Sequence, residues 1–339
     1  MTIKTGVMGV GRMGVEHCYQ IEDTEGFELV AVSSRAEERR RTIQYEFDVK
    51  IYPDHTALLA DPEVELVVIA THTSNHEEWA IKALEAGKHV VVEKPMCLSL
   101  EGAERMIATA EECGRVLTVH QNRRWDQDFQ TVRKIVEDGL LGEPFAFESR
   151  VMSFYEGWPA WGAEGMANPW RIKKAYGGGL LMDWGPHLID QVLLLVPSPV
   201  VGVFGDLQSR IWATEVDDHF KCILRFEDGT IAQVEASNNA LRPLPRWYIL
   251  GTKGTLWSQG GNSLEWGDIK LNLEYAGVPQ ELTFEIDQPE LSTGFYPDLY
   301  EALTTGREPA VKLSEARRVM QVLDAVRESA RTGEVVRLS

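Results

Sequence analysis

The sequence has little of several features that mark special classes of protein. Its 339 residues include only four cysteines, and no two of these form a C-x-x-C pair. It therefore predicts neither a disulfide framework nor a zinc knuckle. The apolar runs are far shorter than the roughly 20 residues that a membrane-spanning helix needs. There is also no internal repeat and no low-complexity tract.

Positive charge is scarce as well. The 34 lysines and arginines stand against 52 aspartates and glutamates, for a formal net charge of −18. Such a charge disfavours attraction to nucleic acid or to an anionic membrane, so we expect neither as a partner. A small-molecule ligand fits better. The first residues lack the charged and apolar regions of a secretory signal, and we expect a cytoplasmic protein.

The chain does contain a regular alternation of apolar runs and amphipathic segments up to residue 122. The strand-like runs lie at 3–10, 29–33, 66–70, 90–92 and 116–119. Residues 79–87 have helical spacing and end in Gly87, a glycine C-cap signal. This alternation is typical of βαβ units, so we expect an α/β domain with a doubly wound parallel sheet over residues 1–122.

The pattern changes after residue 123. A helical segment at 129–138 leads into an aromatic-rich stretch and then into alternating runs typical of strands. Two such runs, 220–226 and 230–236, flank a Glu-Asp-Gly turn, which is a strong hairpin signal. We expect a second, α+β domain over residues 123–339 with a mostly antiparallel sheet. Its helix at 314–332 is a candidate to pack back on the first domain.

Gly9, Gly11 and Gly14 form the pattern G-x-G-x-x-G directly after the first apolar run and at the start of a helical segment. In that context the glycines permit a tight turn and a close approach of pyrophosphate to a helix N-terminus. We expect these glycines, with Arg12 and Met13 between them, to bind a dinucleotide.

The residues after the second apolar run bear on the choice of cofactor. An acidic residue about 20 positions after the glycines would bind the ribose 2′-hydroxyl of NAD. Here that place holds Ser33, Ser34 and Arg35, whose hydroxyl and guanidinium groups suit a 2′-phosphate. We expect NADP, with NAD as the alternative. Arg41 fits a solvated helix face, paired with Glu37.

Lys94 ends an apolar strand in the run Glu93-Lys94-Pro95. A buried parallel strand is normally a continuous run of valine, isoleucine and leucine, so this charge needs a reason. Ligands of open parallel sheets bind outside the carboxyl ends of the strands. We therefore expect Lys94 to be catalytic and both Glu93 and Lys94 to border the cofactor. The structural alternative is that Lys94 only pairs with Glu93 or Asp183.

These motifs stand in the same order as in the glucose–fructose oxidoreductase, inositol dehydrogenase and MocA-like family, which the chain resembles over nearly its whole length. The likeness rests on the glycine pattern, on Glu93-Lys94-Pro95 and on the run 177–190 with Asp183 and His187. It implies a Rossmann domain joined to an α+β domain with an open antiparallel sheet. It also implies NAD(P)-dependent oxidation or reduction of a sugar-like alcohol or ketone, by homodimers or homotetramers built through that sheet.

The chain departs from this family pattern in one loop. Such proteins commonly have Thr-Pro after the third main strand, where this chain has Thr71-His72. Thr73 and His76 follow in the matching positions. We expect Thr71, His72, Thr73 and His76 to run beside the nicotinamide.

The proline next to His187 is a second departure. If a helix ran unbroken from Leu180, Pro186 would delete one backbone hydrogen bond and kink it. If the helix instead starts near Gly185, the proline stands at a favoured first position. The sequence leaves both possibilities open.

Hydride transfer from a carbinol to nicotinamide needs a proton acceptor and a donor that steadies the developing alkoxide. We expect His187 to accept the proton, Asp183 to orient it or bind a substrate hydroxyl, and Lys94 to donate to the reacting oxygen. Lys94 as the base is the alternative. The structural alternatives are a core histidine for His187 and a helix cap for Asp183. No clear metal-ligand set is present, and we expect no metal.

Five of the ten tryptophans lie between residues 125 and 184, and flat rings suit the C–H faces of sugar and cyclitol rings. Salt bridges between the domains are the alternative role for Arg123, Arg124 and Asp126, and core packing is the alternative for several of the aromatic residues. The alternatives to a sugar or cyclitol dehydrogenase are an NAD-retaining enzyme of glycoside cleavage or epimerisation and a non-catalytic cofactor-binding regulator. The expected substrate ligands are Lys94, Arg123, Arg124, Trp125, Asp126, Tyr155, Trp170, Asp183 and His187.

Overall fold

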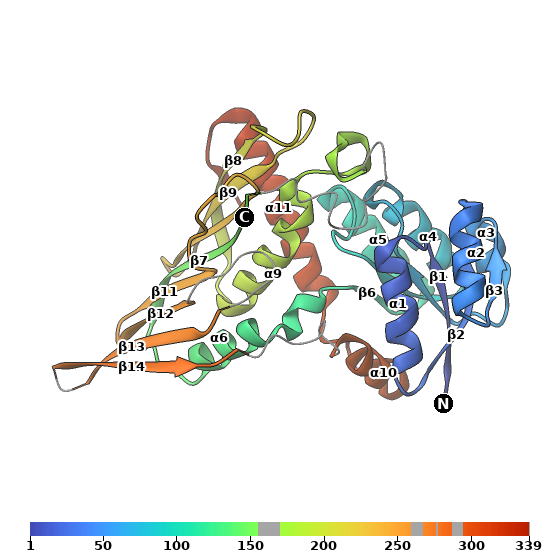
Figure 1. Ribbon diagram of the computed structural model, residues 1–339, viewed down its shortest axis with the longest axis horizontal. Coiled ribbons are helices and arrows are strands. Elements are labelled where there is room, and N and C mark those ends of the chain that lie inside the picture. The colour runs from blue at the N-terminus through green and yellow to red at the C-terminus, as the bar shows by residue number, and fades with distance from the viewer. Residues whose placement is uncertain (155–169, 259–266, 276, 287–293, 339) are drawn as a thin grey trace. The chain divides into compact units, whose positions relative to one another are not determined.

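The computed structural model describes residues 1–154, 170–258, 267–275, 277–286 and 294–338 (Figure 1). The chain divides into two compact units. The first consists of Met1–Gln121, Ala175–Gly177 and Thr293–Met320, and the second of Asn122–Lys174, Gly178–Ser292 and Gln321–Ser339. Each unit has a sheet of its own.

The first unit contains a six-stranded parallel sheet with the order β3-β2-β1-β4-β5-β6. This is the order of dinucleotide-binding folds, which reverses between β1 and β4. The predicted doubly wound parallel sheet is confirmed, although the sequence pattern omits the three-residue strand β3. The strands are β1 (Ile3–Met8), β2 (Phe27–Ser33), β3 (Lys50–Tyr52), β4 (Leu66–Ile69), β5 (His89–Val92) and β6 (Leu117–Val119).

Helices cover this sheet. α1 packs against β2 and β4, and α4 against β4 and β5. Because β1–α1–β2 and β4–α4–β5 run in opposite directions along the sheet, right-handed crossovers place α1 and α4 on opposite faces. The predicted pair of Glu37 and Arg41 is confirmed on the exposed side of α2, at 2.6 Å. The helices are α1 (Arg12–Asp23), α2 (Glu37–Glu46), α3 (His55–Ala60), η1 (Thr73–Asn75), α4 (His76–Glu85) and α5 (Leu100–Cys113).

A segment from late in the chain completes the first unit. It forms α10 (Phe295–Thr305) and the start of α11 (Leu313–Thr332). The Tyr300 hydroxyl donates to the carbonyl of Met1 at 2.8 Å, and the Thr118 hydroxyl donates to the carbonyl of Val311 at 3.1 Å. Tyr300 within α10 and Val311 between the two helices therefore both bond this segment to the rest of the unit.

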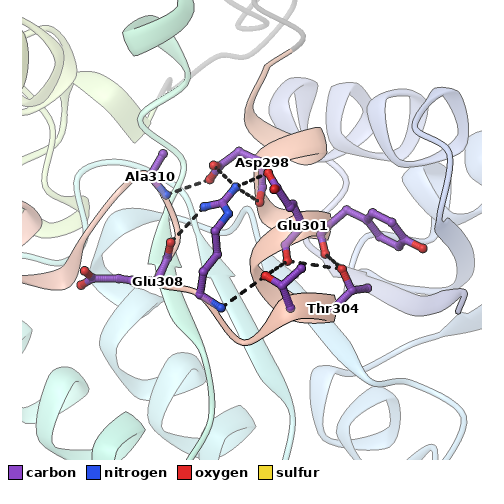
Figure 2. Close-up of polar contacts among 8 residues, drawn as sticks. Asp298, Glu301, Thr304, Glu308 and Ala310 are labelled. Atoms are coloured by element: carbon purple, nitrogen blue, oxygen red, sulfur yellow. Dashed lines mark hydrogen bonds and ion pairs between the residues drawn. The ribbon is translucent and has the colours of Figure 1, made fainter.

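The turn between α10 and α11 is held by polar contacts that include Asp298, Glu301 and Glu308 (Figure 2). The guanidinium of Arg307 donates to the carboxylates of Asp298 at 2.6 Å and Glu301 at 2.8 Å, and to the carbonyl of Glu308 at 3.0 Å. Asp298 also accepts the backbone N–H of Ala310 at 2.8 Å. The Asp298 carboxylate thus bonds the first turn of α10 to Arg307 and Ala310, which follow the helix.

The second unit contains a nine-stranded sheet with the order β14-β13-β12-β11-β7-β10-β9-β8-β15. β7 and β10 run parallel, and the other described pairs run antiparallel. The predicted mostly antiparallel sheet and the hairpin, formed by β9 and β10, are confirmed. The strands are β7 (Pro144–Met152), β8 (Val200–Gln208), β9 (His219–Phe226), β10 (Ile231–Ser237), β11 (Trp247–Gly251), β12 (Gly254–Ser258), β13 (Ile269–Tyr275), β14 (Val278–Phe284) and β15 (Val336–Arg337).

The two faces of this sheet differ. α9 packs against β7 and β10, and α6 packs against β13. On the opposite face the apolar side chains of Phe204, Ile223 and Ile231 are 40%, 40% and 46% exposed. The helices of this unit are η2 (Asn122–Trp125), α6 (Gln127–Glu137), η3 (Trp170–Ile172), α8 (Leu180–Asp183) and α9 (Gly185–Leu195), and η4 (Lys174–Tyr176) is divided between the two units. Among the described helices, none combines the length and apolar character needed to cross a membrane.

Candidate active site

The predicted cofactor residues gather at one edge of the parallel sheet. Neighbouring strands are in register at Ser33, Met8, Ile69, Val92 and Val119. The residues that follow them along the carboxyl edge are Ser34, Gly9, Ala70, Glu93 and His120. Ligands of such sheets bind outside this edge, at the point where the strand order reverses. Five separate sequence segments therefore meet where a dinucleotide would lie.

The glycine turn after β1 has strict steric requirements. Gly9 has a φ of +87°, and a Cβ there would lie 2.8 Å from the carbonyl oxygen of Ala70. A Cβ on Gly14 would lie 1.8 Å from the carbonyl oxygen of Gly9. A Cβ on Gly11, by contrast, would meet no described atom within 4 Å. The open space at Gly11, at the N-terminus of α1, fits a pyrophosphate bound by backbone N–H groups.

The three residues predicted to select the cofactor differ in exposure. Ser33 is fully buried, and its hydroxyl lies 2.7 Å from Nδ1 of His55. Ser34 is buried, whereas Arg35 is exposed. The guanidinium of Arg40 donates to the carbonyls of Ser34 at 2.7 Å and Arg35 at 2.9 Å. Arg35 thus offers its charge to solvent, while the Ser33 hydroxyl is bonded inside the domain.

The loop after β4 is tied to the loop after β5 by His76. Its Nδ1 lies 2.9 Å from the carbonyl oxygen of Pro95, and its Nε2 lies 3.2 Å from that of Thr71. Burial lowers the pKa of His76. Thr73 is buried, and the ring of His72 packs at 4.8 Å from that of Tyr176. In this structure His76 acts as a link between the two loops.

Glu93 and Lys94 follow β5, and the Glu93 carboxylate is buried. Its Oε1 lies 3.0 Å from Nε2 of His17 and 2.8 Å from Nδ1 of His120. Lys94 is partly buried. The motifs do not include His17 or His120. A usable signal for His17 was its place beside Gly14, Cys18 and Ile21 on the buried face of α1, where a histidine is unusual.

In the second unit, Asp183 and His187 stand on either side of a helix break. α8 ends at Asp183, and α9 begins at Gly185 with Pro186 in its first turn. Of the two possibilities for Pro186, the favoured position near a helix start is confirmed. His187 is buried, and its backbone N–H donates to the carbonyl of Trp184 at 3.1 Å.

The start of α8 is held by Asp217, which the sequence analysis missed. The backbone N–H of Leu180 donates to its carbonyl at 3.0 Å, and that of Leu181 donates to its carboxylate at 2.6 Å. Desolvation raises the pKa of Asp217 to about 7, although the backbone donors favour the charged form. The carboxylate of Asp183 at the other end of α8 lies 3.6 Å from Nε of Arg171.

The predicted substrate residues around η2 are joined by ion pairs. The Arg124 guanidinium donates to the Asp190 carboxylate at 2.7 and 2.6 Å. Arg123 donates to Asp126 at 2.9 Å and stacks 4.6 Å above the ring of Trp184. Burial raises the pKa of Asp126, against the opposing charge of Arg123. These pairs lie within the second unit.

A buried hydrogen-bonded chain connects η2 to α9 and the sheet. Gln191, four residues after His187, donates to the carbonyl of Arg123 at 2.8 Å. Arg246 donates to the Gln191 side-chain oxygen and to the Ser149 hydroxyl, both at 2.5 Å. Burial lowers the pKa of Arg246 to about 10, so it stays charged near neutrality. The loop of Arg123 is therefore fixed to the helix of His187.

The remaining predicted residues are divided between the units. Lys94 belongs to the first unit, and Asp183 and His187 belong to the second. Trp125 is partly buried, and the Arg171 guanidinium stacks 4.5 Å above the ring of Trp170. The predicted ligand Tyr155 lies outside the described residues, as do two of the five clustered tryptophans, Trp158 and Trp161.

Comparison with known proteins gives matches along the chain. Two family models match: an oxidoreductase family with an NAD-binding Rossmann fold over residues 3–121, and the GFO/IDH/MocA C-terminal domain over residues 129–257. The uncharacterized oxidoreductase YdgJ of Escherichia coli is 31% identical, over 97% of this chain and 96% of that protein. The scyllo-inositol 2-dehydrogenase (NADP(+)) IolW of Bacillus subtilis is 27% identical, over 99% and 96%. The crystal structure of an NAD-binding protein from Listeria innocua is 34% identical, with a TM-score of 0.87 over 99% and 97% of the two chains.

Proposed function

Because the chain belongs to the glucose–fructose oxidoreductase, inositol dehydrogenase and MocA family of oxidoreductases, we propose that it moves hydride between NAD(P) and a sugar or cyclitol. The reacting group is a ring carbinol or its ketone. One observation carries the proposal: Lys94 follows β5 at the same sheet edge as the glycine turn. The two lie two strands apart, or roughly 10 Å. A nicotinamide whose pyrophosphate lies at the turn is within reach of a lysine there.

The proposed roles follow from the chemistry of hydride transfer. A nicotinamide dinucleotide held at the glycine turn would supply or take up the hydride. His187 takes the hydroxyl proton during oxidation and returns it during reduction. Lys94 donates a hydrogen bond to the reacting oxygen and so stabilises its developing negative charge. Asp183 orients His187 or binds a neighbouring hydroxyl.

The proposed substrate is a polyhydroxylated ring. The fixed pair of Arg123 and Asp126 offers both donors and acceptors, which suits a ring carrying several hydroxyls. The naming of one relative as a scyllo-inositol 2-dehydrogenase supports the same substrate class.

For the cofactor we propose NADP. Arg35 is exposed at the end of β2, where an NAD-specific domain would carry an acidic residue. A guanidinium can bind a 2′-phosphate with two parallel hydrogen bonds. The name of the relative from Bacillus subtilis includes NADP(+), which agrees with this choice.

We further propose that the open face of the nine-stranded sheet joins copies of the chain into a dimer or tetramer. Phe204 and Ile223 are directly opposite each other on β8 and β9, and both are 40% exposed. Ile231 lies opposite Arg225 on the same face and is 46% exposed. Apolar side chains in contact on an open sheet favour burial against a second copy.

A turnover assay tests the proposed function. The purified protein is mixed with NAD⁺ or NADP⁺ and a panel of inositols and sugars, while the absorbance of the reduced nicotinamide is followed. We expect turnover with at least one cyclic polyol and a higher affinity for NADPH than for NADH. Tight cofactor binding without turnover across the whole panel would contradict the proposal and favour a cofactor-binding regulator.

A further inference from the structure

Four buried side chains from distant parts of the chain form one hydrogen-bonded cluster in the first unit. They are His17 on α1, Glu93 after β5, His120 after β6 and Tyr296 on α10, and none of these residues is more than 6% exposed. Glu93 Oε1 lies 3.0 Å from His17 Nε2 and 2.8 Å from His120 Nδ1. The Tyr296 hydroxyl lies 2.7 Å from His17 Nδ1.

These contacts fix the positions of the protons. An ionised carboxylate only accepts, so His17 donates from Nε2 and His120 donates from Nδ1. With its proton on Nε2, His17 accepts at Nδ1 a hydrogen bond from the Tyr296 hydroxyl. Burial alone would raise the pKa of Glu93, but its bonds with His120 and His17 hold that pKa well below the usual value. Burial lowers the pKa of His120. The Glu93 carboxylate is therefore ionised and hydrogen-bonded to both imidazoles.

A metal ion is the competing explanation for this group. The ligand atoms of His17, Glu93 and His120 lie within 4.8 Å of one another. A metal on Nδ1 of His120 would move the ring proton to Nε2. Among the described residues that Nε2 is buried and has no hydrogen-bond partner, so the proton would be buried without an acceptor. The geometry therefore favours a hydrogen-bonded cluster.

Glu93 is hydrogen-bonded to two segments at the carboxyl edge of the sheet, one in α1 and one at Lys94. Through His17, three residues after Gly14, it is bonded to the helix whose N-terminus is the proposed phosphate site. Its Oε2 accepts the backbone N–H of Lys94 at 3.1 Å. We infer that Glu93 is a positioning residue that couples cofactor binding at α1 to the placement of Lys94. This inference rests on the proposed function, because that function gives Lys94 its role at the nicotinamide.

Three variants test the coupling. Glu93→Gln keeps the shape of the side chain but replaces one accepting oxygen with an NH₂ group, so at least one of its three donors loses its acceptor. Tyr296→Phe is milder, since it removes only the hydroxyl that sets the tautomer of His17. Glu85→Gln, at an exposed position on α4, is the matched control.

Hydrogen–deuterium exchange, measured with and without NADPH, tests the coupling and does not require the enzyme to turn over substrate. In the wild type and Glu85→Gln we expect NADPH to slow exchange both in α1 and in the segment 93–97. In Glu93→Gln the slowing persists in α1 and is lost at 93–97, and in Tyr296→Phe it is reduced there. If Glu93 had a purely structural role, Glu93→Gln would raise exchange at 93–97 equally with and without NADPH. In the turnover assay we expect kcat of Glu93→Gln to fall roughly 100-fold with little change in NADPH affinity.

The outcomes are separable. The inference is overturned if NADPH slows exchange at residues 93–97 as much in Glu93→Gln and Tyr296→Phe as in the wild type. If Glu93→Gln does not fold, the result for Tyr296→Phe decides. One equivalent of tightly bound metal per chain, measured by elemental analysis, would also overturn it. A wild-type protein that shows the coupled protection but turns over no substrate would support the inference and contradict the proposed function.

Discussion

The guanidinium of Arg124 forms two hydrogen bonds with the carboxylate of Asp190, three residues after His187 on α9. Their side chains are only 7% and 3% exposed. Removing one partner leaves the other charge buried, so we expect Asp190→Asn to lower the free energy of unfolding by about 3–5 kcal/mol in urea denaturation. Arg124→Lys keeps the charge and should cost less. A loss below ~1 kcal/mol in Asp190→Asn would mean that the pair behaves as a surface ion pair.

His187→Ala and Lys94→Ala should nearly abolish turnover and leave NADPH affinity close to that of the wild type. The reason is that both side chains are proposed to act on the substrate oxygen and its proton, whereas the cofactor's phosphates are proposed to bind at the glycine turn. Steady-state kinetics and NADPH fluorescence titration measure the two effects separately. Near-normal turnover in both variants would remove this assignment.

Gly11→Ala and Gly14→Ala should have different effects. The first should weaken NADPH binding, and the second should destabilise the fold. The new methyl group at residue 11 meets no described atom within 4 Å, so stability should be kept while it obstructs the pyrophosphate and weakens NADPH binding. At residue 14 the methyl group would lie 1.8 Å from a carbonyl oxygen, and the protein should be strongly destabilised. Thermal unfolding and NADPH titration give the two readouts. Unchanged NADPH affinity in Gly11→Ala would place the phosphates elsewhere.

Asp217 predicts a pH dependence of stability near neutrality. Its pKa is raised from an ordinary 3.8 to about 7 in the folded protein. A group with a raised pKa stabilises the fold below its unfolded pKa, and that contribution is lost as the pH rises through the folded value. Asp217→Asn removes the titration but keeps an acceptor for Leu181. We expect the melting temperature of the wild type to fall relative to Asp217→Asn between pH 5 and 8. If the melting temperatures of the wild type and Asp217→Asn changed in parallel with pH, that would contradict the raised pKa of Asp217.

The open sheet face predicts a change of oligomeric state. Phe204→Asp combined with Ile223→Asp places two charges where apolar side chains are proposed to meet a second copy, so we expect dissociation to smaller species. Light scattering after size-exclusion chromatography measures the mass. Tyr45→Ser, at a 93% exposed apolar position in the first unit, is the control. An unchanged mass in the double variant would place the interface elsewhere.

The periodicity of apolar residues was sufficient to predict most of the fold, because this periodicity follows from which side chains are buried. It identified β4 and β5, whose residues are almost all buried, but not β3, where Lys50, Ile51 and Tyr52 are exposed or partly exposed at the sheet's edge. It could not give the parallel pairing of β7 with β10, because that pairing depends on which strands meet after folding.

The candidate site was predictable where its residues form contiguous motifs, such as the glycine turn and Glu93-Lys94-Pro95. It was not predictable where function depends on distant partners. His17 and Tyr296 are 279 positions apart, and neither stands in a recognisable pattern. Ser33 was predicted to bind the cofactor, and no local feature indicated that its hydroxyl would lie 2.7 Å from Nδ1 of His55.

The return of α10 to the parallel-sheet unit has a consequence for biosynthesis. The residues that pack against Phe27 and His17, namely Tyr296 and Tyr300, are translated long after the six strands. While the chain is still emerging from the ribosome, the first unit therefore has an uncovered apolar surface. It becomes complete only after most of the other unit has been made, so the nascent chain needs protection from aggregation until then.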